Sequence, residues 1–500
     1  MGIIRRTGLF TLCLCLAAPP AARAADQWNE LKTPHFTVMS NASDSSTRAL
    51  AWQLEQVRST TKTLWAWAKV DLNKPLTVIA VKDENTMRAL APQYWEERGR
   101  GRPASVWVTG ADRHYLAIRT SLDVESQGNI NPHITAYFSY INLVMMQSLS
   151  PDLPLWLSRG LTGVLSNTLI RDDHIIIGAP IPWHLEALRE RPRTMLPKLL
   201  ALTRQSPALS REEGAESFDA QTWAFVHFLM FADQGARAGK LNEFAQAVSA
   251  GKDAAAAFRE SLGTPESFEL PFRMYFERQM FPVRRINIDL TVEREKLPIA
   301  RMAAAESAAT RALFHVAMRR PAEARAAIAE ARKLDARAPG SHEAEGLLLD
   351  REDKDNDARL AFAKAVEAGS TNSYVHYRLA SLTWSPAADQ DTLKQIEGYL
   401  AKATALNARD ADAYSWLGEI RAVLGIGEPT GLVLRAVSLE PDEAVHRLRA
   451  AFVLVRLRRY DEAAAQARAG QALARTDSER NRAQQLLDMI AKAKAGGGAL

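Results

Sequence analysis

The residues that could do metal or hydrolytic chemistry in this chain are few, and their spacing does not suit that chemistry. The only adjacent His-Glu pair is His342-Glu343. A zinc-binding helix with this pair would need a second histidine one turn later, and Gly346 stands there. An isolated helical histidine is more often structural than a ligand, so the residues predict no metal site. The other histidines considered as ligands are His133, His174, His184 and His227.

The sequence also lacks the motifs for nucleophilic catalysis and for phosphate binding. The two cysteines, Cys13 and Cys15, both lie in an N-terminal apolar segment, and no Gly-x-Ser-x-Gly elbow is visible. The glycine-rich stretch 425–431 lacks the lysine and the preceding strand of a phosphate-binding loop. It is more typical of a turn between two helices.

The first residues have the features of a secretory signal. Arg5-Arg6 forms a positive start, Gly8–Ala18 is apolar but too short to span a bilayer, and Ala22-Arg23-Ala24 precedes a cleavage point at Ala25. We therefore expect an exported bacterial protein, periplasmic or secreted, with a signal peptide over residues 1–24.

The charge balance gives no support for a strongly basic protein, such as one that binds nucleic acid through its net charge. The formal net charge is +5, and Arg5, Arg6 and Arg23 would leave with the signal. The remaining acidic and basic side chains are nearly equal in number and interspersed. Such a surface gives no electrostatic reason to expect a nucleic acid or an anionic membrane as partner.

The second half of the chain repeats itself. Blocks begin near residues 305, 339, 373, 411 and 444, and each has small or apolar residues at positions 7 and 8 and small residues further on. This pattern resembles the tetratricopeptide repeat (TPR), which has a period of about 34 residues and two closely crossing helices. Extra residues at 385–391 explain the one long step. Marks of the pattern are Pro321-Ala322-Glu323-Ala324, Gly346, Leu379-Ala380, Leu417-Gly418 and Tyr460-Asp461-Glu462-Ala463.

The first half places short strands before helices, which is an α+β pattern. Gly110-Ala111-Asp112-Arg113 lies between two of the strands and predicts a hairpin turn. The expected strands cover 35–39, 76–81, 105–109 and 114–118, and the expected helices cover 46–68, 131–149, 154–168, 218–232 and 241–260.

Three stretches of the first half carry a resemblance to a known family: Leu153–Leu161 (LPLWLSRGL), Ile175–Pro180 and Phe218–His227. Together they resemble the peptidase-MA-like (gluzincin) domains that precede TPR arrays in bacterial secreted proteins. The resemblance covers roughly residues 28–283. It implies a thermolysin-like α+β fold, followed here by an all-α TPR solenoid.

The same resemblance implies that the chemistry is lost. The family's His-Glu-x-x-His helix would fall at residues 138–142 or one residue later, where Phe138, Ser139 and Asn142 stand. Its third ligand, a glutamate, is replaced by Arg159, whose fixed charge would repel zinc. We therefore expect a pseudoenzyme without metal or cofactor.

Arg159 and Tyr140 are the two residues expected to face the former cleft, with Ser139 as an alternative to the tyrosine. A guanidinium there could bind a peptide carboxylate with its planar fork. The alternative is that Arg159 points to solvent or pairs with an acid such as Asp152 or Asp172.

These patterns predict a non-catalytic, exported scaffold that binds a protein or peptide through the concave face of the TPR array. Two alternatives stay open: a metallopeptidase-like hydrolase with an atypical site, and a structural assembly factor of a cell-envelope complex. The array is expected to need no contacts with residues 26–283. The expected organisation is a signal peptide over 1–24, a degenerate peptidase-MA-like domain over 25–283, a connector over 284–303, about five TPRs over 304–476, and a cap helix with a flexible tail over 477–500.

Overall fold

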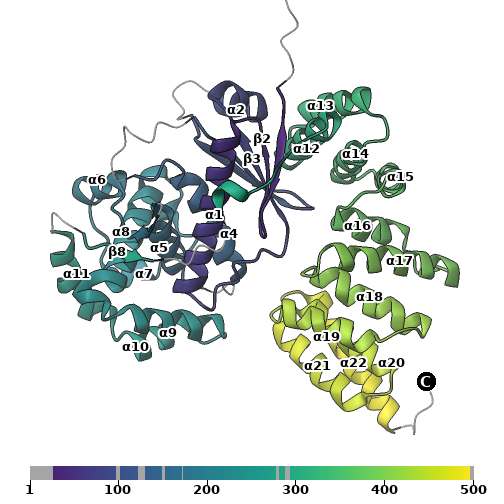
Figure 1. Ribbon diagram of the computed structural model, residues 1–500. Coiled ribbons are helices and arrows are strands. Elements are labelled where there is room, and N and C mark those ends of the chain that lie inside the picture. Colours follow the sequence, from purple (N-terminus) through teal and green to yellow (C-terminus); the bar gives the residue numbers. More distant parts are fainter. Residues whose placement is uncertain are drawn as a thin grey trace, which may run out of the picture.

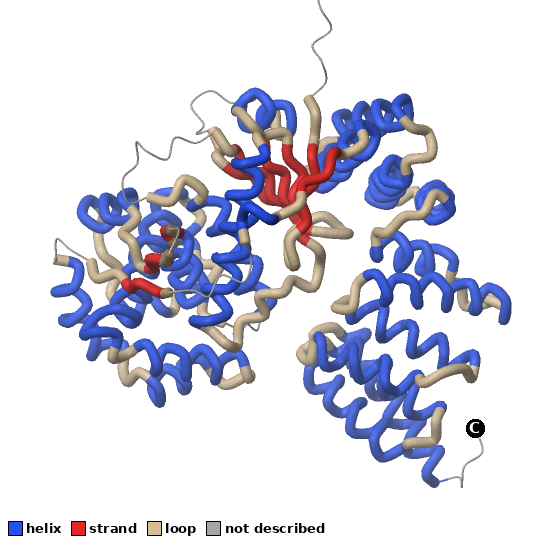
Figure 2. Tube along the Cα trace, in the orientation of Figure 1, coloured by secondary structure: helices blue, strands red, loops and turns tan. Residues whose placement is uncertain are grey.

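The computed structural model describes residues 26–96, 102–121, 130–148, 153–171, 173–277, 281–287 and 293–495. The expected signal peptide, the last five residues of the chain, Asp152 and Asp172 lie outside these ranges. A part that mixes strands and helices comes first, and an array of helices follows it (Figures 1 and 2). Within the described residues, no helix is both long enough and apolar enough to cross a membrane.

A six-stranded sheet forms the centre of the mixed part, in the order β4-β5-β3-β2-β1-β9. Strand β3 runs parallel to both of its neighbours, whereas the outer pairings are antiparallel. All six side chains of β3 are buried, as its continuous apolar sequence predicts. The strands are β1 (Asn29–Lys32), β2 (Thr37–Ser40), β3 (Leu76–Val81), β4 (Ser105–Thr109), β5 (His114–Arg119) and β9 (Ile299–Arg301).

Helices α1 (Asp44–Leu64), α4 (Ile134–Ser148), α5 (Leu155–Ser166) and α8 (Glu212–Phe231) share one large hydrophobic core with this sheet. Gly160 allows α5 to pack directly on α8, because an added Cβ would lie 2.4 Å from Val226. The remaining elements of the mixed part are α2 (Glu84–Leu90), α3 (Gln93–Glu96), α6 (Pro182–Glu190), α7 (Leu196–Leu200), α9 (Ala238–Ser249), α10 (Ala254–Ser261), α11 (Glu269–Phe276) and a small sheet of β6 (Leu169–Ile170), β7 (Ile175–Ile177) and β8 (Arg284–Ile286).

The second part consists of tandem antiparallel helix pairs, so the expected repeat array is confirmed. The first helices of the pairs start at Ala304, Pro339, Ser373, Ala411 and Ala444, each within one residue of a block start expected from the sequence. The pairs are α12 (Ala304–Ala317) with α13 (Pro321–Leu334), α14 (Pro339–Arg351) with α15 (Asp355–Glu367), α16 (Ser373–Thr383) with α17 (Gln390–Leu406), α18 (Ala411–Leu424) with α19 (Pro429–Leu439), and α20 (Ala444–Arg456) with α21 (Tyr460–Leu473); α22 (Asp477–Ala495) ends the array.

The array packs directly against the mixed part, and the expectation that it can fold without these contacts stays a prediction. Strand β9, which lies in the expected connector, pairs with β1 at the sheet edge. The second face of the sheet shares a hydrophobic cluster with helices α12 to α16. At its centre, Phe314 of α12 meets Tyr115 of β5 edge to face, with ring centroids 5.9 Å apart. The first repeats are therefore built onto the sheet.

The mixed part is α+β, as predicted, since its described sheet strands and helices share one core. Helix α5 packs against both α4 and α8. This packing positions the residues that carry the resemblance to the peptidase-MA-like domains. These three helices therefore hold most of the residues that the sequence singles out.

Candidate binding site between the sheet and the repeat array

The side chain of Arg159 lies where helices α4, α5 and α8 meet. Its guanidinium carbon is 5.0 Å from the ring centre of Phe138 on α4. Its Nε donates to Oδ1 of Asp219 on α8 at 2.8 Å, and its Nη2 donates to Oδ2 of the same carboxylate. The fork that we expected to bind a ligand carboxylate is thus filled by Asp219 of the chain itself.

Burial affects the protonation of Asp219 in this ion pair. It raises the pKa of Asp219, and the charge and hydrogen bonds of Arg159 lower that pKa again without fully offsetting the burial. Arg159 and Asp219 are 30% and 22% exposed. Loss of either side chain would leave the charge of the other poorly solvated, so the fold is stabilised only when both partners are present.

Tyr140 does not share the space of Arg159. Its hydroxyl donates to the carbonyl oxygen of Val70 at 3.1 Å, and its ring packs on Phe36. Burial raises its pKa far above the usual range of a tyrosine. Phe138 and Tyr140 are two residues apart, about 200° around a helix, which explains why they point to different sides of α4.

Ser139 and Asn142 also serve local structure. The Ser139 hydroxyl donates to the carbonyl of Thr135 at 2.9 Å, and the Asn142 amide reaches the sulfur of Met146 at 3.5 Å. The structure therefore brings together Phe138 and Arg159 among the expected site residues, and it leaves Ser139, Tyr140 and Asn142 outside that contact.

The histidine with the clearest environment, His227, is held between two hydrogen-bonding partners. Its Nε2 lies 2.8 Å from the carbonyl oxygen of Gly178, so this nitrogen carries the proton, and its Nδ1 accepts from the Tyr275 hydroxyl at 2.7 Å. Burial lowers the pKa of His227 to about 4, against a smaller opposing effect of the Gly178 carbonyl. Among all described residues, no group of three or more His, Cys, Asp or Glu is placed to hold a metal ion.

The turn between β4 and β5 reaches from the sheet to the array. Nδ2 of Asn372, just before α16, donates to Oδ2 of Asp112 at 3.0 Å. Arg113 pairs with the same carboxylate at 2.7 Å. Tyr374 and Tyr377 line a cavity of about 150 Å³ beside this turn. The amino-terminal end of α16 thus already holds a segment of polypeptide from outside the array.

A second polar contact joins the two parts further along the array. Arg409, between α17 and α18, pairs with Asp71 at 3.2 Å, and Nε of Arg58 on α1 donates to Asp71 at 2.9 Å. Burial would raise the pKa of Asp71, but the hydrogen bond and charge of Arg58, with Arg409 and His35, lower it below its ordinary value. Arg409 lines three adjacent cavities and stands at their junction.

Asn73 completes this contact. Its Nδ2 donates to Glu440 at 3.2 Å, and its carbonyl oxygen accepts from Asn407 at 3.0 Å. Asp112, Asp71 and Asn73 together make a line of contacts with the array. This line of contacts is called the seam. The end of the seam at Asp112, called proximal, borders the hydrophobic cluster shared with the sheet. The contacts of Asp71 and Asn73 at the other end, called distal, are polar.

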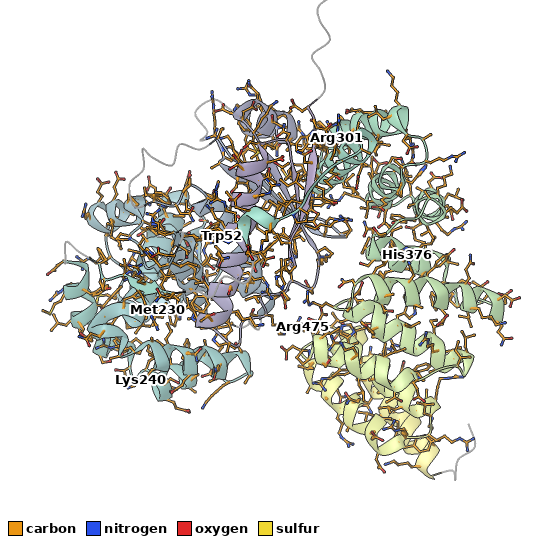
Figure 3. The ribbon with its side chains drawn as sticks, in the orientation of Figure 1. Trp52, Met230, Lys240, Arg301, His376 and Arg475 are labelled. Carbon is orange, nitrogen blue, oxygen red and sulfur yellow. The ribbon has the colours of Figure 1, made fainter. Side chains whose placement is uncertain are left out.

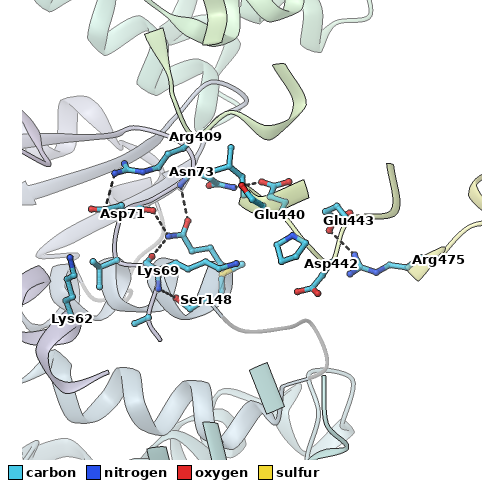
Figure 4. Close-up of a pocket in the computed structure, with 17 residues that line it drawn as sticks. Lys62, Lys69, Asp71, Asn73, Ser148, Arg409, Glu440, Asp442, Glu443 and Arg475 are labelled. Carbon is cyan, nitrogen blue, oxygen red and sulfur yellow. Dashed lines mark hydrogen bonds and ion pairs between the residues drawn. The ribbon is translucent and has the colours of Figure 1, made fainter. Parts of the chain in front are cut away.

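A cavity of about 520 Å³, larger than the other two that Arg409 lines, lies at the distal end of the seam (Figure 4). One wall comes from the end of α1 and the segment 69–73, and the other from the loops 438–443 and Arg475. Figure 3 places Arg475 on the side of the array that faces the mixed part. Gln147 and Ser148 at the end of α4 fix the first wall: Gln147 donates to the carbonyl oxygens of Lys69 and Asp71, and Ser148 accepts from the Lys69 amide at 2.7 Å.

The first helices of the later repeats, together with the last helix of the array, carry a further set of interacting side chains. Tyr377 of α16 meets Trp416 of α18 at 5.9 Å. Glu419 of α18 pairs with Arg449 of α20 at 3.2 Å and with Arg482 of α22 at 3.6 Å. We call these five residues the distal face. It spans four helices and combines aromatic rings with both signs of charge.

Sequence reasoning named none of Asp71, Asn73, Asn372 and Arg409, which form the seam. Asp112 was identified only as part of a turn. A signal was present in the loops between repeats, where Asn407 and Arg409 interrupt an alanine-rich pattern. Nothing in that pattern indicates which surface those loops meet.

No family model matches the chain, and no curated protein matches it. Solved structures do. YrrB, a TPR protein with an unusual peptide-binding site, is 19% identical, and the match covers 37% of this chain and 93% of YrrB at a TM-score of 0.31. The TPR protein TTC0263 of Thermus thermophilus is 21% identical, with 37% and 99% covered and a TM-score of 0.26. PilF of Pseudomonas aeruginosa is 16% identical, with 39% and 93% covered and a TM-score of 0.27.

Proposed function

We propose that the protein is a non-catalytic scaffold that binds a segment of another protein on its repeat array. The observation that carries this proposal is the turn 110–113 held at the amino-terminal end of α16 by Asn372. Here the array already binds polypeptide through the side chain of the residue that precedes a first helix. The turn is held at the start of α16, and the distal face, which continues from Tyr377 of α16 to the end of the array, is the part of the expected concave surface that we assign to a partner.

The chemistry of the distal face suits a partner segment with mixed character. Tyr377 and Trp416 offer apolar ring surface, and the Glu419 cluster offers a carboxylate between two guanidinium groups. Aromatic residues and arginine are the side chains that most often carry binding energy at protein interfaces.

The experiment is cross-linking of a photoreactive partner segment to the purified full-length protein, followed by comparison of three variants. Arg482→Glu and Tyr377→Ala change the distal face, and Arg468→Glu changes an exposed position on α21. A partner captured by the wild type and by Arg468→Glu, but lost from both distal-face variants, supports the proposal. A partner retained equally by all three proteins would place binding elsewhere.

The mixed part is proposed to derive from a peptidase-MA-like domain whose catalytic residues have been lost. The contact between Phe138 and Arg159 supports this, because both occupy positions that the resemblance assigns to metal-site residues. Purified protein that hydrolyses casein, with activity removed by a zinc chelator and restored by zinc, would contradict a non-catalytic role.

Export is proposed from the signal-like residues 1–24. Expression of the full sequence in a bacterium with a periplasm, followed by N-terminal sequencing of the periplasmic fraction, should give a chain that begins at Ala25. Recovery of uncleaved protein from the cytoplasm alone would contradict this.

A further inference from the structure

Strand β4 lies at one edge of the six-stranded sheet, and β5 is its one neighbour among the described strands. The antiparallel ladder between β4 and β5 has hydrogen-bonded pairs at both ends. The Arg119 amide donates to the Ala104 carbonyl oxygen at 2.9 Å, and the Gly110 amide donates to the Arg113 carbonyl oxygen at 2.8 Å. Because hydrogen-bonded and non-hydrogen-bonded pairs alternate in such a ladder, these two pairs fix the direction of every backbone group of β4.

By this alternation, the backbone amides and carbonyls of Ser105, Trp107 and Thr109 point away from β5. They make no backbone hydrogen bond with any residue in the ranges that the structure describes. The free edge of β4 therefore presents donors and acceptors that another extended strand can pair with.

Strand β4 also lacks the features that usually prevent an edge strand from pairing with another chain. Such edges carry charged side chains, a proline or a bulge, or the strand is very short. Strand β4 has five residues, none of them charged or proline, and it pairs with β5 without a bulge. The opposite edge of the same sheet is protected, because β9 has three residues, follows Pro298 and carries the exposed Arg301.

The sequence of β4 is nearly the same in both directions about Trp107. Val106 and Val108 flank the tryptophan, and the hydroxyl residues Ser105 and Thr109 flank the valines. When two copies of β4 lie antiparallel with Trp107 opposite Trp107, valine meets valine and serine meets threonine. In this register the outward backbone groups of Ser105 face those of Thr109 in the second copy, so hydrogen-bonded pairs form at alternate positions. The strand is therefore complementary to itself about a two-fold axis.

We propose that β4 pairs antiparallel with β4 of a second copy of this chain, about a two-fold axis at Trp107, so that one sheet continues across a homodimer. Trp107 is 40% exposed, and a cross-strand pair of aromatic rings adds to the backbone hydrogen bonds. A strand of an unrelated partner would gain the same backbone hydrogen bonds, but it would have no need of the symmetric sequence. This inference does not depend on the proposed binding of a partner by the array, because it uses residues of the sheet alone.

Sedimentation velocity of the purified protein between about 1 and 100 μM should show a reversible equilibrium of monomer and dimer, because a small interface binds weakly. Trp107→Lys and Trp107→Glu, each alone, place like charges opposite each other at the axis. Each should weaken dimerisation by about tenfold or more. An equimolar mixture of the two variants should dimerise again, because lysine then faces glutamate.

Two further variants separate backbone pairing from contact between the rings. The Trp107 amide points away from β5, so Trp107→Pro removes an outward donor and leaves the β4–β5 ladder intact. It should abolish the dimer, whereas Trp107→Ala keeps the amide and should weaken the dimer less. The matched controls are Trp384→Lys and Trp384→Glu, which change a tryptophan that is 48% exposed at the end of α16. Both controls should dimerise as the wild type does.

The proposal is overturned if the wild type stays monomeric over the whole concentration range. A dimer that persists equally in the Lys, Glu and Pro variants of Trp107 also overturns it, because the interface would then lie elsewhere. So does a mixture of Trp107→Lys and Trp107→Glu that stays monomeric, since Trp107 would then not face its own counterpart. Circular dichroism checks that each variant keeps its fold, and the mixture decides the question even if the proline variant is unfolded.

Discussion

Arg159 on α5 and Asp219 on α8 form an ion pair with two hydrogen bonds, one of which measures 2.8 Å. Asp219 occupies the guanidinium fork that the sequence led us to expect would bind a ligand carboxylate. The pair also links the two helices that carry the most characteristic stretches of the sequence. Its energetic role can be separated from any role in binding, because a structural pair affects stability in the absence of every partner.

Replacing Arg159 by Met should lower the free energy of unfolding by about 1–3 kcal/mol, because Asp219 loses the donors that offset its burial. Asp219→Leu should also destabilise. The double variant should lose less than the sum of the two, since neither charge is then left unpaired. Urea unfolding of the four proteins measures this, and additive losses within about 0.5 kcal/mol would show that the pair is not coupled.

Asn372→Ala should destabilise the chain by about 1–3 kcal/mol, because Asp112 and the buried Glu343 each lose a hydrogen bond from the Asn372 amide. Asn407→Ala is the matched control. Its amide contacts the carbonyl oxygen of Asn73 at the exposed distal end of the seam, and its loss should cost less. Equal shifts of the thermal midpoint in the two variants would contradict a special role for the turn.

Stability should fall as the pH is lowered from about 6.5 toward 4. Burial lowers the pKa of His133, His184 and His227 to about 4 in the folded chain, whereas an unfolded histidine titrates near 6.5. The folded state therefore binds fewer protons than the unfolded state in this window. The stabilisation is complete above 6.5 and is lost as the pH falls through the window. Thermal midpoints should fall less steeply with pH for His227→Gln than for the wild type.

Asp410 acts in the opposite direction. Burial raises the pKa of this N-cap of α18 to about 6, despite its hydrogen bond from the amide of Ala413. Its contribution to stability is greatest below the unfolded pKa of 3.8 and is lost as the pH rises through 6. Asp410→Asn keeps a capping oxygen and removes the charge. It should raise the thermal midpoint at about pH 7 and leave it unchanged near pH 3.5, and an equal shift at both pH values would contradict the titration of Asp410.

The array expressed alone, as residues 304–500, should bind a hydrophobic dye and unfold at a lower temperature than the intact chain. Phe314 and Leu313 are almost completely buried in the intact chain, in a cluster that includes Tyr115. Removing the sheet exposes them. A fragment without dye binding, and with the same midpoint as the helical transition of the full chain, would show that the shared cluster is dispensable.

The repeats could be predicted because their steric requirement is local and periodic. At Gly346, for example, an added Cβ would lie 2.4 Å from the Phe362 ring of the paired helix. The mixed α+β class followed from the order of strands and helices. By contrast, Asp112 and Asn372 are 260 residues apart, and no periodicity in either half specifies their contact.

The candidate site could be predicted only in part. Arg159 was identified from its neighbours in the chain, but its partner Asp219 lies 60 residues further on and was named only as part of a helix. Tyr140 was expected near Arg159 because it stands beside the positions of the lost zinc motif on the neighbouring helix, and helix geometry turns it to another side of α4. The seam required knowledge of how the two parts pack, which single-sequence patterns do not contain.

The pairing of β9 with β1 and the burial of Phe314 attach the first repeat of the solenoid to the sheet. Repeat arrays commonly lengthen in evolution by duplication of internal units. In this chain, a duplication within the first two repeats would displace Asn372 from Asp112 and separate α12 from the sheet. A duplication beyond Arg475 would leave every contact of the seam in place. Lineages of this architecture should therefore differ in length at the carboxyl-terminal end of the array and keep its first repeats constant in number.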